Sequence, residues 1–233
     1  MNAVFVTGTD TDCGKTRVGC ALARGLRAAG LRVRALKPVE TGCAERGGSL
    51  VPADALALAA AAGDDAPLER LCPYPLRLAA APETAAQSAG IELDLQRIAA
   101  ALDRARADAD AVLVEGAGGL LVPLGPELDM AGLARRLALP VIVVARARLG
   151  TLNHTLLTLE AAAARSLDVV GVALSHTCAG LSQGELRNLD ALRAHLARRS
   201  VPWLGELGHG AELLAPDPAP RVLLDALGAS WLK

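Results

Sequence analysis

A loop rich in small residues, between an apolar run and a helical pattern, carries the clearest chemistry of this sequence. The run Ala3–Val6 is followed by Gly8–Thr16, which reads GTDTDCGKT. Small residues let successive backbone N–H groups turn toward a phosphate chain, and a helix that begins near Gly14 directs its positive dipole end at the same charge. Lys15 is expected to reach the β- and γ-phosphates, and the Thr16 hydroxyl to bind Mg²⁺. The segment therefore predicts a phosphate-binding loop and the use of a nucleotide.

The spacing of this loop differs from the strict form of the motif, because five residues separate Gly8 from Gly14. A merely structural Gly-rich turn is therefore the alternative. Val18, Leu22 and Leu26 recur at helical spacing directly after the loop. This succession of strand, loop and helix favours phosphate binding.

Charged side chains stand at the predicted ends of two further apolar runs, which Lys37 and Glu115 terminate. In a parallel sheet the carboxyl ends of the strands share one edge, where ligands bind. A buried carboxylate is costly unless a cation compensates it, and Mg²⁺ prefers hard oxygen ligands. Thr16, Asp54 and Glu115 thus form a candidate magnesium site. The alternatives are a solvated surface lysine at Lys37 and, at Asp54, an acidic residue that stabilises a helix start.

The elements that must position these residues alternate between apolar runs and helical patterns along the whole chain. This pattern is typical of a parallel sheet covered by helices on both faces. The predicted fold class is α/β, P-loop NTPase-like, with a mostly parallel central sheet, and residues 1–233 are expected to form a single domain. Residues 63–90 carry four prolines and little periodicity, and they are predicted to be an ordered excursion over the site. Strands are predicted at 3–7, 32–37, 111–115, 141–145, 169–174 and 201–204, and helices at about 15–29, 52–62, 94–107, 129–138, 151–166 and 184–199.

The composition gives neither a strong overall charge nor a membrane segment. The chain carries 24 Lys and Arg against 25 Asp and Glu, a formal net charge of −1, which does not favour nucleic acid or a membrane surface as partner. No signal segment or long apolar stretch is recognised, and a cytoplasmic location is expected. The five cysteines lack the spacing of metal ligands or of a disulfide framework, so reduced thiols are predicted. Cys13 is expected to fill space beneath the loop, with a catalytic thiol as the alternative.

Taken together, several segments resemble the ATP-dependent dethiobiotin synthetase family. They read FVTGTDTDCGKT, LKPVETG, DALALA, VLVEGAGGLLVPL, LPVIVVARARLGTLNHTLLT and LGEL, and they cover nearly the whole chain in the order of that family. The resemblance implies an ATP-dependent cyclo-ligase of biotin biosynthesis, active as a homodimer with its substrate site at the interface. It implies that CO₂ or bicarbonate is joined to 7,8-diaminononanoate, with ATP as co-substrate and Mg²⁺ as cofactor, through a carbamate and a carbamic-phosphoric anhydride.

The same resemblance implies roles for individual residues. Lys37 is implied as the active-site lysine, assisted by Lys15 and Thr11, and the family commonly reads adenine with an Asn where this chain has Ser175. Weak selectivity for the nucleotide base is therefore expected. The residues implied in ATP binding are Asp12, Cys13, Gly14, Lys15, Thr16, Arg17, Asp54, Glu115, Gly116, Ala117, Gly118, Ser175, His176, Gly208, His209 and Gly210. Those implied in substrate binding are Thr41 and, from the neighbouring subunit, Gly150, Thr151, Leu152 and Asn153.

Two other classes of protein share a similar loop. Amide-forming synthetases of the cobyrinic acid type carry an additional glutamine-hydrolysing domain, for which 233 residues leave no room. Partition-type ATPase switches normally have a second lysine early in the loop, where this chain has Thr9–Thr11, and a basic amphipathic tail, which this sequence does not show.

Overall fold

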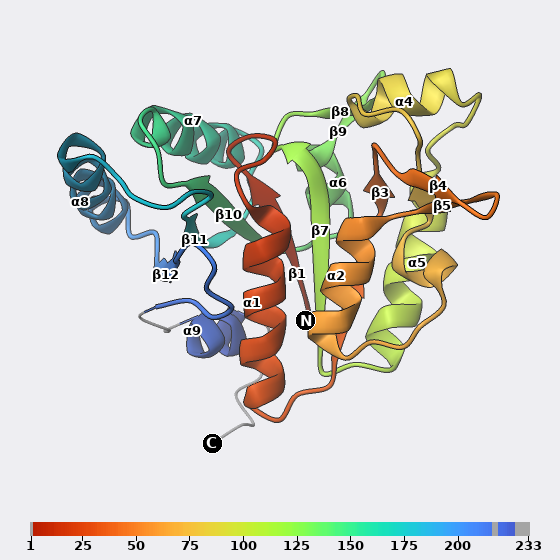
Figure 1. The fold of residues 1–233 in the computed structure, drawn as a ribbon, viewed down its shortest axis with the longest axis horizontal. Coiled ribbons are helices and arrows are strands. Elements are labelled where there is room, and N and C mark those ends of the chain that lie inside the picture. Colours follow the sequence, from red (N-terminus) through yellow and green to blue (C-terminus); the bar gives the residue numbers. More distant parts are fainter. Residues whose placement is uncertain (1, 216–218, 227–233) are drawn as a thin grey trace.

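The computed structural model describes residues 2–215 and 219–226, and its centre is a sheet of six parallel strands in the order β12-β11-β10-β1-β7-β2 (Figure 1). Strands buried on both faces are largely apolar, and all residues of β1 are buried. In sheet order the strands span Trp203–Leu207 (β12), Val169–Ser175 (β11), Val141–Arg146 (β10), Ala3–Gly8 (β1), Ala111–Gly119 (β7) and Val33–Leu36 (β2).

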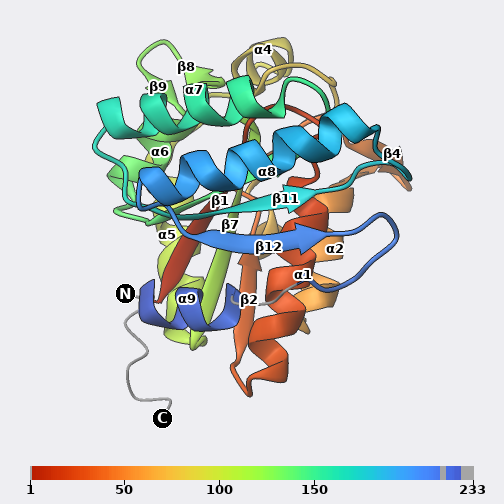
Figure 2. The ribbon, with the colours of Figure 1, turned by 90° about the vertical axis from the view of Figure 1, so that its left-hand side faces the viewer.

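Helices cover both faces of this sheet. Successive residues of a strand point to opposite faces, so Val4 and Val6 pack in one core with α1, α2 and α9, whereas Ala3 and Phe5 pack in a second core with α5, α6, α7 and α8. Figure 1 shows α1 beside α2, and Figure 2 shows α8 and α9 on opposite sides of edge strand β12. The first layer comprises Lys15–Ala28 (α1), Ala53–Ala62 (α2) and Ala219–Ala226 (α9), and the second comprises Leu95–Ala107 (α5), Met130–Arg136 (α6), Thr151–Ala164 (α7) and Gln183–Arg198 (α8).

Every strand and helix predicted from the sequence is present, and the predicted fold class is confirmed. Most strand ends differ slightly from the prediction, and the largest differences are at β7, which continues to Gly119, and at β12, which continues to Leu207. Helix α8 begins with a capping box, in which Ser182 and Glu185 each accept a hydrogen bond from the other residue's backbone N–H.

Residues 63–90 support the segment that follows Lys37, and none of them is among the residues that line the pocket at the phosphate loop. Lys37 donates its backbone N–H to the Leu71 carbonyl at 2.8 Å, and Val39 pairs with Tyr74. The sequence pattern does not predict the short strands and short helices of the chain, because a periodic pattern cannot be recognised over so few residues. The short elements are Val39–Glu40 (β3), Ala44–Arg46 (β4), Ser49–Val51 (β5), Leu68–Leu71 (α3), Tyr74–Pro75 (β6), Pro82–Ser88 (α4), Pro123–Gly125 (β8) and Leu128–Asp129 (β9).

Candidate active site

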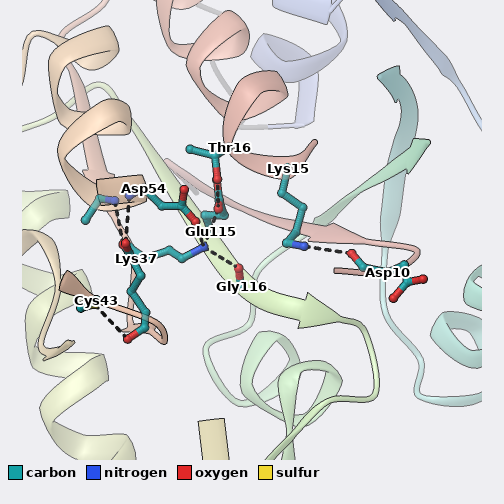
Figure 3. Close-up of polar contacts among 10 residues, drawn as sticks. Asp10, Lys15, Thr16, Lys37, Cys43, Asp54, Glu115 and Gly116 are labelled. Atoms are coloured by element: carbon teal, nitrogen blue, oxygen red, sulfur yellow. Dashed lines mark hydrogen bonds and ion pairs between the residues drawn. The ribbon is translucent and has the colours of Figure 1, made fainter. Parts of the chain in front are cut away.

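The loop between β1 and α1 is closely packed at two glycines, which explains its small residues. Gly14 has a φ of 97°, and a Cβ there would lie 2.2 Å from the Ser175 hydroxyl. A Cβ on Gly8 would lie 2.4 Å from the Cys13 sulfur. Cys13 is itself completely buried, so it fills space beneath the loop, as predicted. The Lys15 ammonium donates a hydrogen bond to the Asp10 carbonyl at 3.0 Å, which holds this side chain across the loop (Figure 3).

A pocket of about 360 Å³ lies beyond this loop, at the carboxyl ends of β1, β2 and β7. Predicted residues from four separate segments line it, together with Glu40 and Thr177, for which the sequence predicts no role. The lining residues are Thr11, Asp12, Gly14, Lys15, Thr16, Arg17, Lys37, Glu40, Thr41, Asp54, Ala117, Gly118 and Thr177.

A charged cluster forms the floor of this pocket. The Lys37 ammonium lies 2.5 Å from Glu115 Oε1 and 3.3 Å from Asp54 Oδ2, and it also donates to the Gly116 carbonyl at 3.1 Å (Figure 3). The Thr16 hydroxyl donates to the same Glu115 oxygen at 2.7 Å. The side chains of Lys37 and Glu115 are only 3% and 1% exposed, whereas that of Asp54 is 46% exposed. Lys37 is therefore a buried cation that faces the phosphate pocket, and not a solvated surface lysine.

The pKa of Lys37 lies above its ordinary value of 10.5. Burial lowers the pKa of an ammonium group, but here the charges of Glu115 and Asp54 and the hydrogen bond to Glu115 outweigh this effect. Lys37 is consequently charged at neutral pH. It can attract and orient anionic groups, and it is not poised to accept a proton as a base.

Glu40 connects the Lys37 segment to the helix that carries Asp54. Its two carboxylate oxygens accept hydrogen bonds from the backbone N–H groups of Asp54 and Ala55, both at 2.9 Å. A carboxylate at a helix N-terminus satisfies free donors and opposes the helix dipole. The role was missed from the sequence because Glu40 caps α2 from a distant segment, and only a local cap leaves a sequence signature.

The donor set of this cluster fits a magnesium ion. Thr16, Asp54 and Glu115 supply hard oxygen donors around one ammonium, and Glu115 Oε2 is buried without a hydrogen-bond partner among the described residues. Within residues 2–215 and 219–226, no group of three or more His, Cys, Asp and Glu side chains is arranged to hold a metal alone. A magnesium ion here would therefore need further oxygen ligands, such as water or the phosphate oxygens of a nucleotide.

The glycines that end β7 have different structural roles. Gly116 is needed for packing, because a Cβ there would lie 2.9 Å from the Phe5 ring. Gly118 has a φ of 64°, and it lines the pocket together with Ala117. Ala117 and Gly118 therefore offer their backbone to a ligand in the pocket, while Gly116 contributes its carbonyl to Lys37.

The residues implied in base recognition lie beside the pocket, at the ends of β11 and β12. Ser175 is completely buried and packs against Gly14, so its hydroxyl is not presented to a ligand. The His176 ring lies 2.7 Å from Glu206, and the carbonyls of His176 and Gly208 both accept hydrogen bonds from Arg17. His209 and Gly210 are exposed in the loop beyond β12.

The residues implied in substrate binding across a dimer lie apart from the pocket of their own chain. Gly150 begins α7 with a φ of 93°, and Thr151, Leu152 and Asn153 follow in its first turn. None of the four lines the phosphate pocket. A groove of about 390 Å³ does connect α7 with the phosphate loop, and Thr11, His154 and Leu157 are among its lining residues.

The cysteines behave as the sequence predicts, because all five are free thiols. Burial raises the pKa of Cys20 and of Cys43 to about 11 and also raises that of Cys72. Neutral buried thiols are poor nucleophiles.

No helix in the described part of the chain is both long and apolar enough to cross a membrane.

Solved structures with the same fold include cell-division ATPases. The chain is similar to the MinD cell division ATPase of Pyrococcus furiosus, with a TM-score of 0.52, 15% identity and 98% coverage of each chain. It is also similar to the septum site-determining protein MinD of Pyrococcus horikoshii OT3, solved with Mg-ADP, with a TM-score of 0.51, 17% identity and 99% coverage of each chain. At these identities the likeness concerns the fold.

Sequence relatives define the family more narrowly. A model of the AAA domain family matches residues 2–216. The ATP-dependent dethiobiotin synthetase BioD of Aromatoleum aromaticum is 44% identical over 93% of this chain and 93% of its own length. The protein of the same name from Anaeromyxobacter dehalogenans strain 2CP-C is 49% identical over 95% of this chain and 99% of its own length. The chain belongs to the ATP-dependent dethiobiotin synthetase family.

Proposed function

We propose that this protein closes the ureido ring of dethiobiotin from 7,8-diaminononanoate, CO₂ and ATP. Family membership makes it an ATP-dependent ligase, and the observation that carries the specific reaction is the buried Lys37 ammonium at the phosphate pocket. A nucleotide switch needs cations for phosphates alone. A carbamate intermediate adds a second anion beside the terminal phosphate, and Lys37 supplies a fixed charge for it.

The residues of the site have separate roles in binding the phosphates, the carbamate and the diamine substrate. Lys15 neutralises the β- and γ-phosphates, and Thr11, at the rim of the pocket, orients groups at the terminal phosphate. Lys37 holds the carbamate in line with that phosphate, while Thr41 contacts the diamine substrate. Phosphoryl transfer is accelerated mainly by positioning and electrostatic stabilisation, so no covalent protein intermediate is required. The terminal phosphoryl group passes from ATP to the carbamate, which leaves ADP and a carbamic-phosphoric anhydride. The second amine then attacks the carbon of this anhydride, displaces phosphate and closes the ring.

We propose Mg²⁺ as the cofactor, held by Thr16, Asp54 and Glu115 together with the nucleotide. When bound, it supplies positive charge that offsets the charge of the phosphates. Glu40 contributes indirectly, because its carboxylate fixes the start of α2 and so directs Asp54 toward the pocket.

The active form is proposed to be a homodimer, in which the helix start at Gly150 of one subunit serves the site of the other. Leu121 and Leu157 line the groove next to Thr11, and their exposures are 49% and 60%. Large apolar side chains that surround a groove are typical of a protein–protein interface. Free N–H groups at the start of α7 suit the carboxylate of the diamine substrate.

The test is an ATPase assay with both substrates. Release of ADP that requires 7,8-diaminononanoate and bicarbonate together supports the proposed reaction. ADP release that is independent of the diamine contradicts it and favours a partition-type switch. ADP release that requires glutamine or ammonia contradicts it as well, in favour of an amide-forming synthetase.

A further inference from the structure

Arg17 directly follows Thr16, a residue of the proposed magnesium site. Its guanidinium group, however, donates hydrogen bonds to backbone carbonyls of two distant segments. Nη1 donates to the His176 carbonyl at 2.9 Å, and Nη2 donates to the Gly208 carbonyl at 2.8 Å. The side chain is half-buried in the first turn of α1. One planar group thus joins the phosphate loop to two other segments of the chain.

The two carbonyls lie directly after neighbouring strands. Ser175 and Leu207 are paired at the carboxyl ends of β11 and β12, and His176 donates its N–H to the Leu207 carbonyl at 2.9 Å. Beyond these points the sheet no longer fixes the backbone, so side-chain contacts must position the loops that follow.

These loops border the phosphate pocket on the side where an adjoining cavity leaves room for the rest of a nucleotide. Thr177 lines the phosphate pocket, while Gly210 and Glu212 line an adjoining cavity of about 300 Å³. Arg17 borders both spaces. The contact between Gly14 and Ser175 adds a second connection between the phosphate loop and the end of β11.

We infer that Arg17 is a positioning residue for the nucleoside part of the nucleotide, which acts by holding the loops after β11 and β12 and not by binding phosphate. The inference rests on the proposed use of ATP. Hydrogen bonds from a charged donor are stronger than neutral ones, and the guanidinium fork reaches two acceptors at fixed geometry. A lysine ammonium in the same place can reach one carbonyl at a time.

The test compares ligands with and without a nucleoside. Calorimetric titration with ADP and with inorganic pyrophosphate is carried out on the unaltered protein, Arg17→Met and Arg17→Lys. Loss of hydrogen bonds to a charged group is expected to weaken ADP binding by about tenfold or more in Arg17→Met, while pyrophosphate binding changes by less than about threefold. Arg17→Lys is expected to restore part of the ADP affinity. Arg27→Met is the matched control, because Arg27 donates to a backbone carbonyl, that of Ala61, from the same helix.

A kinetic measurement adds an independent readout. In Arg17→Met the KM for ATP is expected to rise by about tenfold, with kcat within about threefold of normal, since the phosphates still bind correctly. Equal weakening of ADP and pyrophosphate contradicts the inference, because it locates the effect in the phosphate loop. Unchanged ADP affinity contradicts it as well. Failure of the unaltered protein to bind ADP overturns instead the proposed use of ATP, which keeps the two tests distinct.

Discussion

Substitution of Lys37 by Gln removes the only ammonium group that contacts both Glu115 and Asp54 among the described residues. Glu115 is 1% exposed, so its carboxylate is left with the Thr16 hydroxyl and no compensating charge. Breaking a buried ion pair by removing one partner costs about 3–5 kcal/mol. We therefore expect Lys37→Gln to lower the free energy of unfolding by about this amount in the absence of Mg²⁺, as measured by urea titration.

The double variant Lys37→Gln/Glu115→Gln separates stability from catalysis. It removes both charges of the buried pair, and its free energy of unfolding is expected to recover most of the loss, since a neutral pair has no unpaired charge. Its turnover is expected to stay at least as low as that of the single variant. Removal of one group that stabilises developing charge typically lowers kcat by about 10²–10³, and the double variant also loses a proposed magnesium ligand.

The assay is steady-state formation of dethiobiotin at saturating ATP, diaminononanoate and bicarbonate, at a temperature where each variant is folded. Lys37→Arg, which retains the charge, provides the control for charge alone. A folded Lys37→Gln protein with nearly normal turnover would refute the electrostatic role of Lys37. An unfolding free energy equal to that of the unaltered protein would refute the buried ion pair.

Three further predictions address other parts of the site. Glu40→Ala removes the acceptor for two helix N–H groups and should lower the free energy of unfolding in urea by about 1–2 kcal/mol; an unchanged value would contradict the capping role. Leu157→Glu should give a monomer in sedimentation that binds ATP but lacks turnover, while the control Leu186→Glu, at a leucine that is also more than half exposed, remains an active dimer; an active Leu157→Glu monomer would exclude a shared site. Iodoacetamide at pH 8 should label half-exposed Cys178 before Cys43, whose thiol stays protonated because its pKa is raised to about 11; rapid labelling of Cys43 would show that it is not buried.

The sequence predicts the sheet and its helices because their apolar patterns are local and repeat over many residues. The strands 3–7 and 141–145 and the helix after Gly14 are examples, and each lies where the pattern places it. The strand-end rule also predicts that Lys37 and Glu115 meet, because Lys37 directly follows β2 and Glu115 lies near the carboxyl end of the neighbouring parallel strand β7.

Features that depend on contacts between distant segments could not be predicted in this way. The cap that Glu40 provides for α2, and the carbonyls that Arg17 reaches 159 and 191 residues further along the chain, have no local signal. Ser175 shows the same limit. Its type suggests a weak reader of adenine, but the structure places its side chain beneath Gly14.

The proposed reaction joins the carbon atom of CO₂ to both amines of one substrate in the phosphate pocket. It is tested most directly by the incorporation of label from ¹⁴C-bicarbonate into dethiobiotin, with ADP determined in the same samples. We expect labelled dethiobiotin and one ADP for each molecule formed, in a reaction that requires Mg²⁺ and is nearly abolished in Lys37→Gln. ADP release without labelled product, or labelled product formed at the normal rate by Lys37→Gln, would contradict it.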